Sequence, residues 1–422
     1  MFALVDCNSF FCSVEKVFTP GLRGKPVCVA GSNDGNIVAL TPEAKALGLH
    51  RGDPVFKVRD IINANNVKVF SGNMMLYAAM SRRIVSILRK SIMHVENYSI
   101  DESFCDLNGY EEHYDIVEFM RGVADKIMLY TDIPVSVGIA PTKTLAKVGS
   151  KFAKQYKGYR SVCAIDTEEK RRKALELFDL ADVWGVGRHT FEKLRYYGIK
   201  TPLEFADKSE AWVRHNLTKP GWQTWMELNG RPCIDTHEVA RNQSICTSRS
   251  FGQMVKDFDS VKSAIATFAA SCANKLRGQR SVGKMVTVFV GTNRFREDLQ
   301  QYWNKETVEL MTATSDTIEI TEAAIEALKR VFVEGVWYKK VGVVISGIQP
   351  ECPVQLNLFD PIQNREERAE LMKVIDRMNH KYGLKTIKLG VEGEDNQPWK
   401  VKCEMRTPNY LTDIDELMVV KG

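Results

Sequence analysis

The sequence has no closely spaced pair of cysteines. Ten cysteines are spread over 422 residues without one Cys-x-x-Cys unit, and the seven histidines do not complete a ligand set with them. Structural zinc sites usually take closely spaced ligands of these types. We therefore expect no zinc module of this kind, and we expect the cysteines to be free and mostly buried thiols.

Long apolar runs are also missing. The first five residues are apolar but lead directly to Asp6, whereas a secretory signal peptide has a basic start and a longer apolar stretch. No stretch reaches the roughly eighteen uninterrupted apolar residues that a membrane-spanning helix needs. We expect a cytoplasmic protein without a membrane segment, and 44% hydrophobic residues are enough for several globular cores.

Acidic residues are absent from two basic stretches, although the net charge of the whole chain is only +5. Residues 138–165 contain five lysines and one arginine, and residues 260–296 contain three lysines and four arginines, with no Asp or Glu in either. One basic run is usually a solvated face. Two acid-free runs in different predicted domains make a nucleic-acid backbone a candidate ligand.

The length predicts three or four domains. Strands are predicted at 2–5, 25–30, 95–100, 103–107 and 135–139, and helices at 74–88, 114–129 and 142–153. This alternation predicts an α+β domain around one sheet. Helical patterns after Thr167 predict a small all-α module, and a second α+β domain is expected at 243–349.

Three carboxylates come from predicted strand ends. Asp6 ends the first predicted strand, and Asp101 and Glu102 join the two strands of a predicted hairpin. If these strands pair, the carboxylates supply oxygen ligands of the kind that Mg²⁺ prefers, and phosphoryl transfer from a nucleotide uses two such ions about 3.5 to 4 Å apart. The alternative for an Asp-Glu pair at a turn is a solvated loop. The apolar strands that lead to these residues favour a site.

Five strings of residues are distinctive: Asp6–Phe11, Glu43–Gly48, Tyr98–Glu102, Gly138–Lys147 and Ser248–Gly252. Together they resemble the Y-family of DNA polymerases, in particular the branch with the catalytic subunit of bacterial DNA polymerase V and its plasmid-borne relatives. The resemblance extends over nearly the whole chain. It implies an error-prone, DNA-directed DNA polymerase that extends a primer with deoxynucleoside triphosphates (dNTPs) across damaged template in the SOS response to DNA damage.

The same resemblance implies a multi-domain α+β fold shaped like a right hand. The expected parts are a ferredoxin-like palm (1–11 and 73–166), small fingers (12–72), a helix-hairpin-helix thumb (167–236), an α+β little finger (243–350) and a C-terminal tail (351–422) that binds a clamp and other partners.

For the catalytic centre, the resemblance implies that Asp6 and Asp101 bridge two Mg²⁺ ions. Glu102 would complete the ligands of the first ion, and the backbone carbonyl of Cys7 would support the second.

The resemblance also implies three contacts to the incoming dNTP. Phe11 falls where the family places an aromatic ring that excludes a ribose 2′-hydroxyl, with plain core packing as the alternative. Lys143 would bind the triphosphate. Lys45 would do so more weakly, because many family members have Tyr and Arg where this chain has Pro42 and Lys45, and Lys lacks the bidentate fork of Arg. Leu40 stands where Arg is expected, and nothing in the sequence explains that change.

Several residues are candidates for contact with DNA. Lys147 and Lys151 follow Lys143 at four-residue spacing, which places all three on one helical face, although a solvated face is the alternative for Lys151. Gly185 and Gly187 lie between short helical patterns, where glycines let backbone N–H groups approach a phosphate. Arg249 opens the predicted little finger.

The tail contains a clamp-binding candidate, Gln355, Leu356, Leu358 and Phe359, which resembles the short peptide that bacterial polymerases insert into the sliding clamp. The alternative is a strand end that covers its own domain. By the same resemblance, the rest of the tail would dock a processed UmuD-like dimer and respond to a RecA filament. Apolar residues such as Trp399 and Tyr410 would be costly to expose in an unstructured tail, so they favour a partner surface.

Two other functions remain open at this point. One is a non-catalytic DNA-binding scaffold of polymerase ancestry, which would be expected to lose the carboxylates that this chain retains. The other is a nucleotidyl cyclase, which shares the palm and the two-metal chemistry. The thumb-like hairpin and the clamp-like peptide argue against the cyclase.

Overall fold

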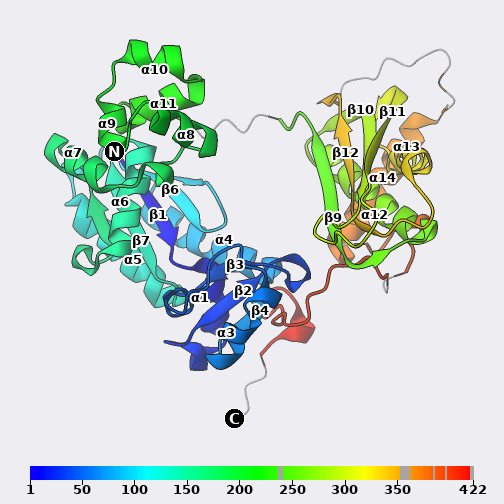
Figure 1. Ribbon diagram of the computed structural model, residues 1–422, viewed down its shortest axis with the longest axis horizontal. Coiled ribbons are helices and arrows are strands. Elements are labelled where there is room, and N and C mark those ends of the chain that lie inside the picture. Colours follow the sequence, from blue (N-terminus) through cyan, green and yellow to red (C-terminus); the bar gives the residue numbers. More distant parts are fainter. Residues whose placement is uncertain are drawn as a thin grey trace. The chain divides into compact units, whose positions relative to one another are not determined.

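The computed structural model describes residues 1–235, 241–351, 360, 362, 364–383, 385–394 and 397–418. The chain forms two compact units (Figure 1). Unit 1 is Met1–Val239 together with Glu404–Gly422, and unit 2 is Ala240–Cys403. Both units contain sheets and helices, which confirms the multi-domain α+β prediction.

The main sheet of unit 1 has the strand order β5-β6-β1-β7-β8. Its strands are β1 (Phe2–Cys7), β5 (His94–Asn97), β6 (Glu102–Asp106), β7 (Val135–Ala140) and β8 (Val162–Ala164). β1 lies in the centre and is antiparallel to both β6 and β7. The first strand therefore does pair with the hairpin, which is the condition on which the candidate site depends.

Side chains along β1 alternate between two cores. Ala3, Val5 and Cys7 belong to the core that includes α4 (Met74–Ser91) and α5 (Ile116–Thr131). Leu4 belongs to the opposite core, with α6 (Lys143–Gln155). Because successive side chains of a strand point to opposite faces, Asp6 lies on the α6 side of the sheet.

Helix α6 lies directly on β7 because Gly138 leaves room for it. A Cβ atom at Gly138 would lie 1.9 Å from the carbonyl oxygen of Ala146 and 2.1 Å from the nitrogen of Ser150. Glycine therefore allows the helix backbone to contact the strand backbone. The helix begins after Thr142, whose hydroxyl accepts a hydrogen bond from the N–H of Leu145. This packing fixes the height of the lysines of α6 above the sheet.

A second, smaller sheet in unit 1 has the order β3-β2-β4. It consists of β2 (Val27–Ala30), β3 (Ile37–Leu40) and β4 (Lys68–Ser71), accompanied by α1 (Phe10–Phe18), α2 (Pro42–Ala46) and α3 (Arg59–Ala64). Residues 404–418 return to this region, where Ser71 and Arg406 form a β-bridge; the returning segment is red in Figure 1.

The segment after Thr167 is helical, as predicted. It contains α7 (Glu168–Leu177), α8 (Arg188–Tyr196), α9 (Pro202–Ala206), α10 (Glu210–Asn216) and α11 (Lys219–Leu228). Short 3₁₀ helices also occur in the described chain, at Pro20–Leu22, Ser32–Asp34, Val55–Lys57, Tyr110–Glu112, Lys157–Tyr159, Leu180–Asp182, Gly390–Glu392 and Ile414–Glu416.

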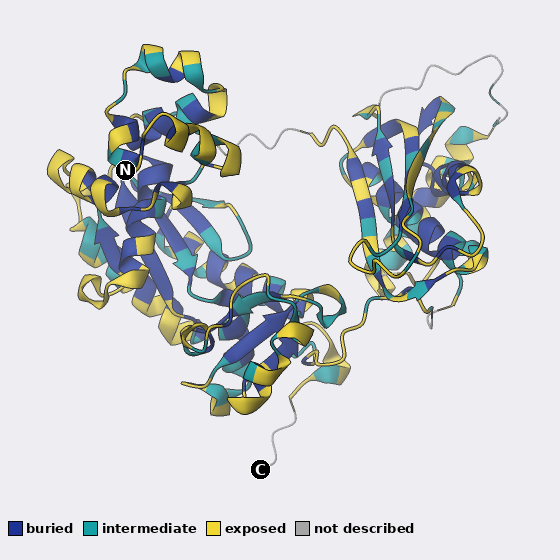
Figure 2. Cartoon of the chain, viewed as in Figure 1, coloured by how far each residue is buried: buried dark blue, intermediate teal, exposed yellow. Residues whose placement is uncertain are grey.

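Unit 2 is a four-stranded antiparallel sheet in the order β11-β10-β12-β9, with β13 (Gln349–Pro350) paired to β10. Its strands are β9 (Ile245–Val255), β10 (Ser281–Gly291), β11 (Trp303–Thr314) and β12 (Tyr338–Ser346). The helices α12 (Phe258–Gly278) and α13 (Thr317–Val331) share a hydrophobic core with the inward side chains of the strands. Figure 2 shows this burial in both units.

The region predicted as one irregular tail is divided between the two units. It contains an 18-residue helix, α14 (Arg365–Tyr382), which the apolar periodicity does not predict because Met372 is its only buried residue. Ion pairs attach this helix to unit 2: Arg365–Glu319 at 2.9 Å, Arg368–Asp316 at 2.8 Å and Arg277–Asp376 at 2.7 Å. The helix is therefore part of unit 2.

Two of the apolar residues in this region pack on the chain itself. Trp399 is buried in unit 2, with its ring 5.8 Å from Phe268 and 6.4 Å from Phe251. Tyr410 stacks on Phe18 of unit 1 at 5.1 Å. Trp399 and Tyr410 therefore need no partner protein to cover them, contrary to the expectation from the sequence.

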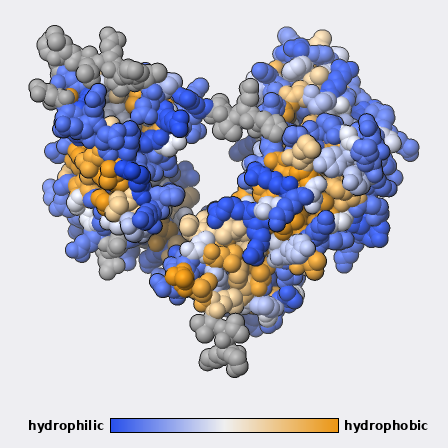
Figure 3. Space-filling view, turned by 180° about the vertical axis from the view of Figure 1, so that it is seen from behind, coloured by the Kyte–Doolittle hydropathy of each residue, from blue (hydrophilic) through white to orange (hydrophobic). Residues whose placement is uncertain are grey.

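The face drawn in Figure 3 is mostly hydrophilic, with separate hydrophobic areas on both units. None of the helices within the described residues is long and apolar enough to cross a membrane. Nine cysteines lie in the described part of the chain, all of them free, and six of these are buried. The prediction of free, mostly buried thiols is confirmed for those nine.

Candidate active site

The three predicted carboxylates lie at one end of the main sheet. Asp6 on β1 is directly opposite Glu102, the first residue of β6. The N–H of Cys7 donates to the backbone oxygen of Asp101 at 2.9 Å, which holds the turn before β6 against the end of β1. Asp6 and Glu102, 96 positions apart in the sequence, thus become cross-strand neighbours, whose Cβ atoms are typically about 5 Å apart.

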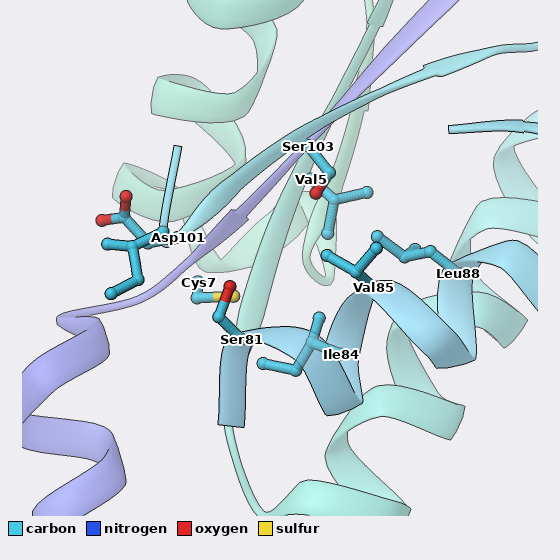
Figure 4. Close-up of a pocket in the computed structure, with 9 residues that line it drawn as sticks. Val5, Cys7, Ser81, Ile84, Val85, Leu88, Asp101 and Ser103 are labelled. Atoms are coloured by element: carbon cyan, nitrogen blue, oxygen red, sulfur yellow. The ribbon is translucent and has the colours of Figure 1, made fainter. Parts of the chain in front are cut away.

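Ser99 shapes the turn that carries the other carboxylates. Its hydroxyl donates to the Asp101 carboxylate at 2.6 Å and accepts from the backbone N–H groups of Asp101 and Glu102 at 3.2 and 3.0 Å. In Figure 4 the Asp101 carboxylate points away from Cys7 and Ser81, which line a small recess between the sheet and α4. The turn therefore directs Asp101 away from the hydrophobic core.

Lysines of α6 neutralise the other two carboxylates. The ammonium group of Lys147 lies 2.6 Å from Glu102, and that of Lys154 lies 3.3 Å from Asp6. Residues seven apart are two turns along a helix and differ by only about 20° around its axis. One stripe of α6 therefore faces both carboxylates.

The electrostatics of Asp6 favour an additional cation. Burial raises the pKa of its carboxyl group, and the negative charges of Glu102 and Asp101 raise it further, while Lys154 opposes the shift. Within the described residues, no three His, Cys, Asp or Glu side chains are assembled as a metal-binding group, and Asp6 and Glu102 form ion pairs with lysines. The donor set nevertheless fits Mg²⁺, since it is made of oxygen ligands with an excess of negative charge.

Lys147 also lies against three aromatic rings. Its ammonium group is 4.8 Å from the ring centre of Tyr98, 5.5 Å from Trp184 and 5.9 Å from Phe104. The indole N–H of Trp184 donates to the Tyr98 hydroxyl at 3.1 Å. These contacts fix the cation at the Glu102 side of the site.

The other predicted lysines of α6 are placed differently. Lys143 is only 4% exposed and forms a 2.7 Å ion pair with Glu96 on β5. Lys151 pairs with Asp182 and lies 4.9 Å from the Phe178 ring. Sequence reasoning missed Lys154, which belongs to the acid-free stretch but does not continue the four-residue spacing. A seven-residue step from Lys147 was the signal that would have found it.

Phe11 lies on α1, directly after the strand that carries Asp6. Its ring is partly buried and stacks on the ring of Tyr77, with centroids 4.5 Å apart and planes 16° apart. Phe11 therefore packs against a core residue without being fully buried itself. The thiol of Cys7 is buried, and burial raises its pKa, so this side chain stays neutral.

This arrangement agrees with the family to which the sequence is similar. The model of the impB/mucB/samB family matches residues 5–151, and that of the C-terminal domain of the same family matches residues 242–358. Protein UmuC of Salmonella typhimurium is 39% identical over the full length of both chains. The chain belongs to the impB/mucB/samB family. This family is a branch of the Y-family DNA polymerases. A further family model, described as a domain of unknown function, matches residues 369–420.

Other relatives and solved structures agree with this membership. Protein ImpB of Salmonella typhimurium is 40% identical over 98% of this chain and 97% of its own, and DNA polymerase IV 1 of Bacillus subtilis is 26% identical over 92% and 91%. A chimeric Y-family DNA polymerase, Dbh-Dpo4-Dbh, has a TM-score of 0.63 at 22% identity and covers 83% of this chain and 100% of its own. This structural likeness confirms the predicted fold class.

The other predicted contact residues that the structure describes lie outside β1, β6 and α6. Lys45 is exposed on α2, and Arg249 is exposed on β9 of unit 2. Gly185 adopts φ +95°, and a Cβ there would lie 2.0 Å from the hydroxyl of Thr224, so helix packing alone requires this glycine. Gly187 is exposed and precedes α8. Gln355, Leu356, Leu358 and Phe359 lie outside the described residues.

Proposed function

We propose that this member of the Y-family is an error-prone translesion polymerase. It extends a DNA primer with dNTPs across damaged template in the SOS response to DNA damage. The observation that carries the proposal is the cross-strand pair of Asp6 and Glu102, with Asp101 in the adjoining turn, at the end of a sheet faced by lysines.

Asp6, Asp101, Glu102 and the carbonyl of Cys7 would hold two Mg²⁺ ions. When bound, these ions would supply activation of the primer 3′-hydroxyl and charge neutralisation of the triphosphate. Lys147 and Lys154 of α6 neutralise Glu102 and Asp6, and the same two lysines would bind phosphate oxygens in a metal-loaded site. The protein itself contributes by holding the carboxylates of β1 and β6 opposite the ammonium groups of α6.

Lys154 is the better candidate than Lys143 for the triphosphate. It is 37% exposed and lies 3.3 Å from Asp6, whereas Lys143 is enclosed with Glu96. Lys45 remains a second candidate, because it is exposed on α2. Phe11, with one face backed by Tyr77, would exclude a 2′-hydroxyl and so select deoxynucleotides.

Primer–template DNA is the proposed macromolecular ligand. Lys151, Gly187 and Arg249 are exposed or partly exposed and would contact its phosphates, which position the duplex without reading sequence. One relevant solved structure is an insertion ternary complex of Dbh DNA polymerase, with TM-score 0.53 and 21% identity over 83% of this chain and 100% of its own. Its fold supports the same assignment.

A primer-extension assay with dNTPs tests this function. The assay compares an undamaged template with one that carries a single abasic site, each with and without Mg²⁺. We expect Mg²⁺-dependent extension on both templates and loss of it in Glu102→Gln. A scaffold would bind the primer–template without extending it, and a cyclase would convert a nucleoside triphosphate to a cyclic product without primer. Either result would refute the proposal.

We further propose the sliding clamp, a processed UmuD-like dimer and a RecA filament as partners. Leu358→Ala with Phe359→Ala should abolish stimulation by a clamp and leave clamp-free synthesis unchanged. For the dimer, Leu417 and Met418 are both more than half exposed in the described C-terminal part. Changing both to Ser should remove co-purification of the dimer, whereas undiminished binding would exclude this surface.

A further inference from the structure

The C-terminal segment, residues 404–418, is built into unit 1 by backbone and side-chain hydrogen bonds. Met405 donates its N–H to the Ser71 hydroxyl at 2.9 Å, and Ser71 donates its N–H to the Met405 oxygen at 3.1 Å. The Asn73 amide donates to the Thr407 oxygen at 2.8 Å. Asn73 also caps α4 by accepting from the N–H of Leu76. The segment therefore holds the first turn of α4.

The deepest contact of this segment is a buried carboxylate. Thr407, only 8% exposed, donates its hydroxyl to Glu15 at 3.3 Å, and the Tyr77 hydroxyl donates to the same carboxylate oxygen at 2.5 Å. Glu15 is fully buried, and its other oxygen has no hydrogen-bond partner among the residues that the structure describes. Burial raises the pKa of this carboxyl group. A buried acidic side chain with so few partners is costly, so its position depends on both donors.

Tyr77 connects this buried group to Phe11. Phe11 and Glu15 are four residues apart on α1 and therefore lie on one face of that helix. Phe11 stacks on the ring of Tyr77 at 4.5 Å, while Glu15 binds its hydroxyl. Tyr77 is itself fully buried. The ring behind Phe11 is thus held at its hydroxyl end by a carboxylate that also binds the C-terminal segment.

We propose that Thr407 and Glu15 are positioning residues for sugar selection. The C-terminal segment fixes Glu15, Glu15 fixes the ring of Tyr77, and that ring fixes the face of Phe11 that meets the sugar of the nucleotide. The inference rests on the proposed role of Phe11. The C-terminal part of the chain, which matches a domain of unknown function, would thereby have a role in substrate choice. A purely structural contact would stabilise unit 1 without altering the choice between sugars.

The test is the ratio of kcat/KM for a dNTP to that for the matching ribonucleotide, on an undamaged primer–template. Thr407→Val keeps the shape of the side chain and removes the donor, whereas Thr407→Ser keeps the donor. Thr412→Val is the matched control, because Thr412 is exposed in the same segment. Tyr77→Phe keeps the stacked ring and removes the hydroxyl, so it tests the same connection from the other side.

We expect Thr407→Val and Tyr77→Phe each to lower the ratio by about threefold to tenfold, the effect of one lost hydrogen bond. Thr407→Ser and Thr412→Val should stay within about twofold of the parent, on the same scale. In a Phe11→Ala background, Thr407→Val should have no further effect on the ratio. Thermal denaturation of each variant separates these effects from unfolding.

Two results would overturn the inference in different ways. If Phe11→Ala lowers the ratio but Thr407→Val and Tyr77→Phe do not, the C-terminal segment has only a structural role and the proposed function stands. If Phe11→Ala itself leaves the ratio unchanged, the proposed role of Phe11 is refuted and the inference falls with it.

Discussion

Replacing Lys154 with alanine, and Lys143 with methionine for comparison, tests whether two lysines of the same helix have different roles. Lys154 faces Asp6 and is partly exposed, whereas Lys143 is enclosed with Glu96. We expect Lys154→Ala to lower kcat/KM for all four dNTPs by a similar factor, because a phosphate contact carries no base information. Lys143→Met, a neutral side chain of similar length, should mainly lower stability.

The magnitude follows from the exposure of each group. Two unit charges about 4 Å apart attract by about 1 kcal/mol in water and about 4 kcal/mol near a protein surface. At 37% exposure, Lys154 lies between these limits, so we expect a loss of about 2 kcal/mol, or about thirtyfold in kcat/KM. Lys143 contributes a counter-charge to a buried pair, and its loss should cost about 3 kcal/mol of unfolding free energy.

The assays are single-nucleotide insertion with each dNTP and chemical denaturation of both variants. An effect of Lys154→Ala on one base only would contradict a phosphate contact. The assignment of the triphosphate to Lys154 would be refuted if Lys143→Met reduced kcat/KM more than Lys154→Ala while unfolding like the parent protein.

Three further predictions follow from the packing and the site. Glu102→Gln should abolish extension, measured by product formation, because the carboxylate is proposed to bind the metal ions. Primer–template affinity in a filter-binding assay should stay within about threefold of the parent, because basic surfaces serve DNA binding. Extension at the parental rate would contradict this prediction. Gly138→Ala should lower the unfolding free energy by about 3 kcal/mol in a denaturant titration, because the added methyl group has no room beneath α6. An unchanged denaturation midpoint would show that the helix can shift to make room. Trp399→Ala should cost about 3 to 5 kcal/mol for loss of a buried ring, and a stable variant would argue against its place in the core of unit 2.

Much of the candidate active site was predictable because the positions of its carboxylates depend on local sequence patterns. An apolar strand that ends in Asp6, and a turn that joins two strands at Asp101 and Glu102, place three carboxylates at strand ends whatever the rest of the chain does. The register adds that Asp6 and Glu102 are direct neighbours. The strand alternation also determines that Asp6 lies on the face opposite Cys7.

The sequence alone determined the family, the candidate carboxylates, the α+β class and the helical character of the segment after Thr167. These depend on local strings and on periodicity. Tertiary structure decided which lysines of α6 face the acids, because spacing defines a stripe on a helix but not the direction in which that stripe points. It also decided the place of α14, which is held by ion pairs such as Arg365–Glu319 rather than by an apolar face, and the return of Thr407 to Glu15 across 392 residues. Contacts between residues so distant in sequence leave no periodic pattern, so only the folded chain reveals them.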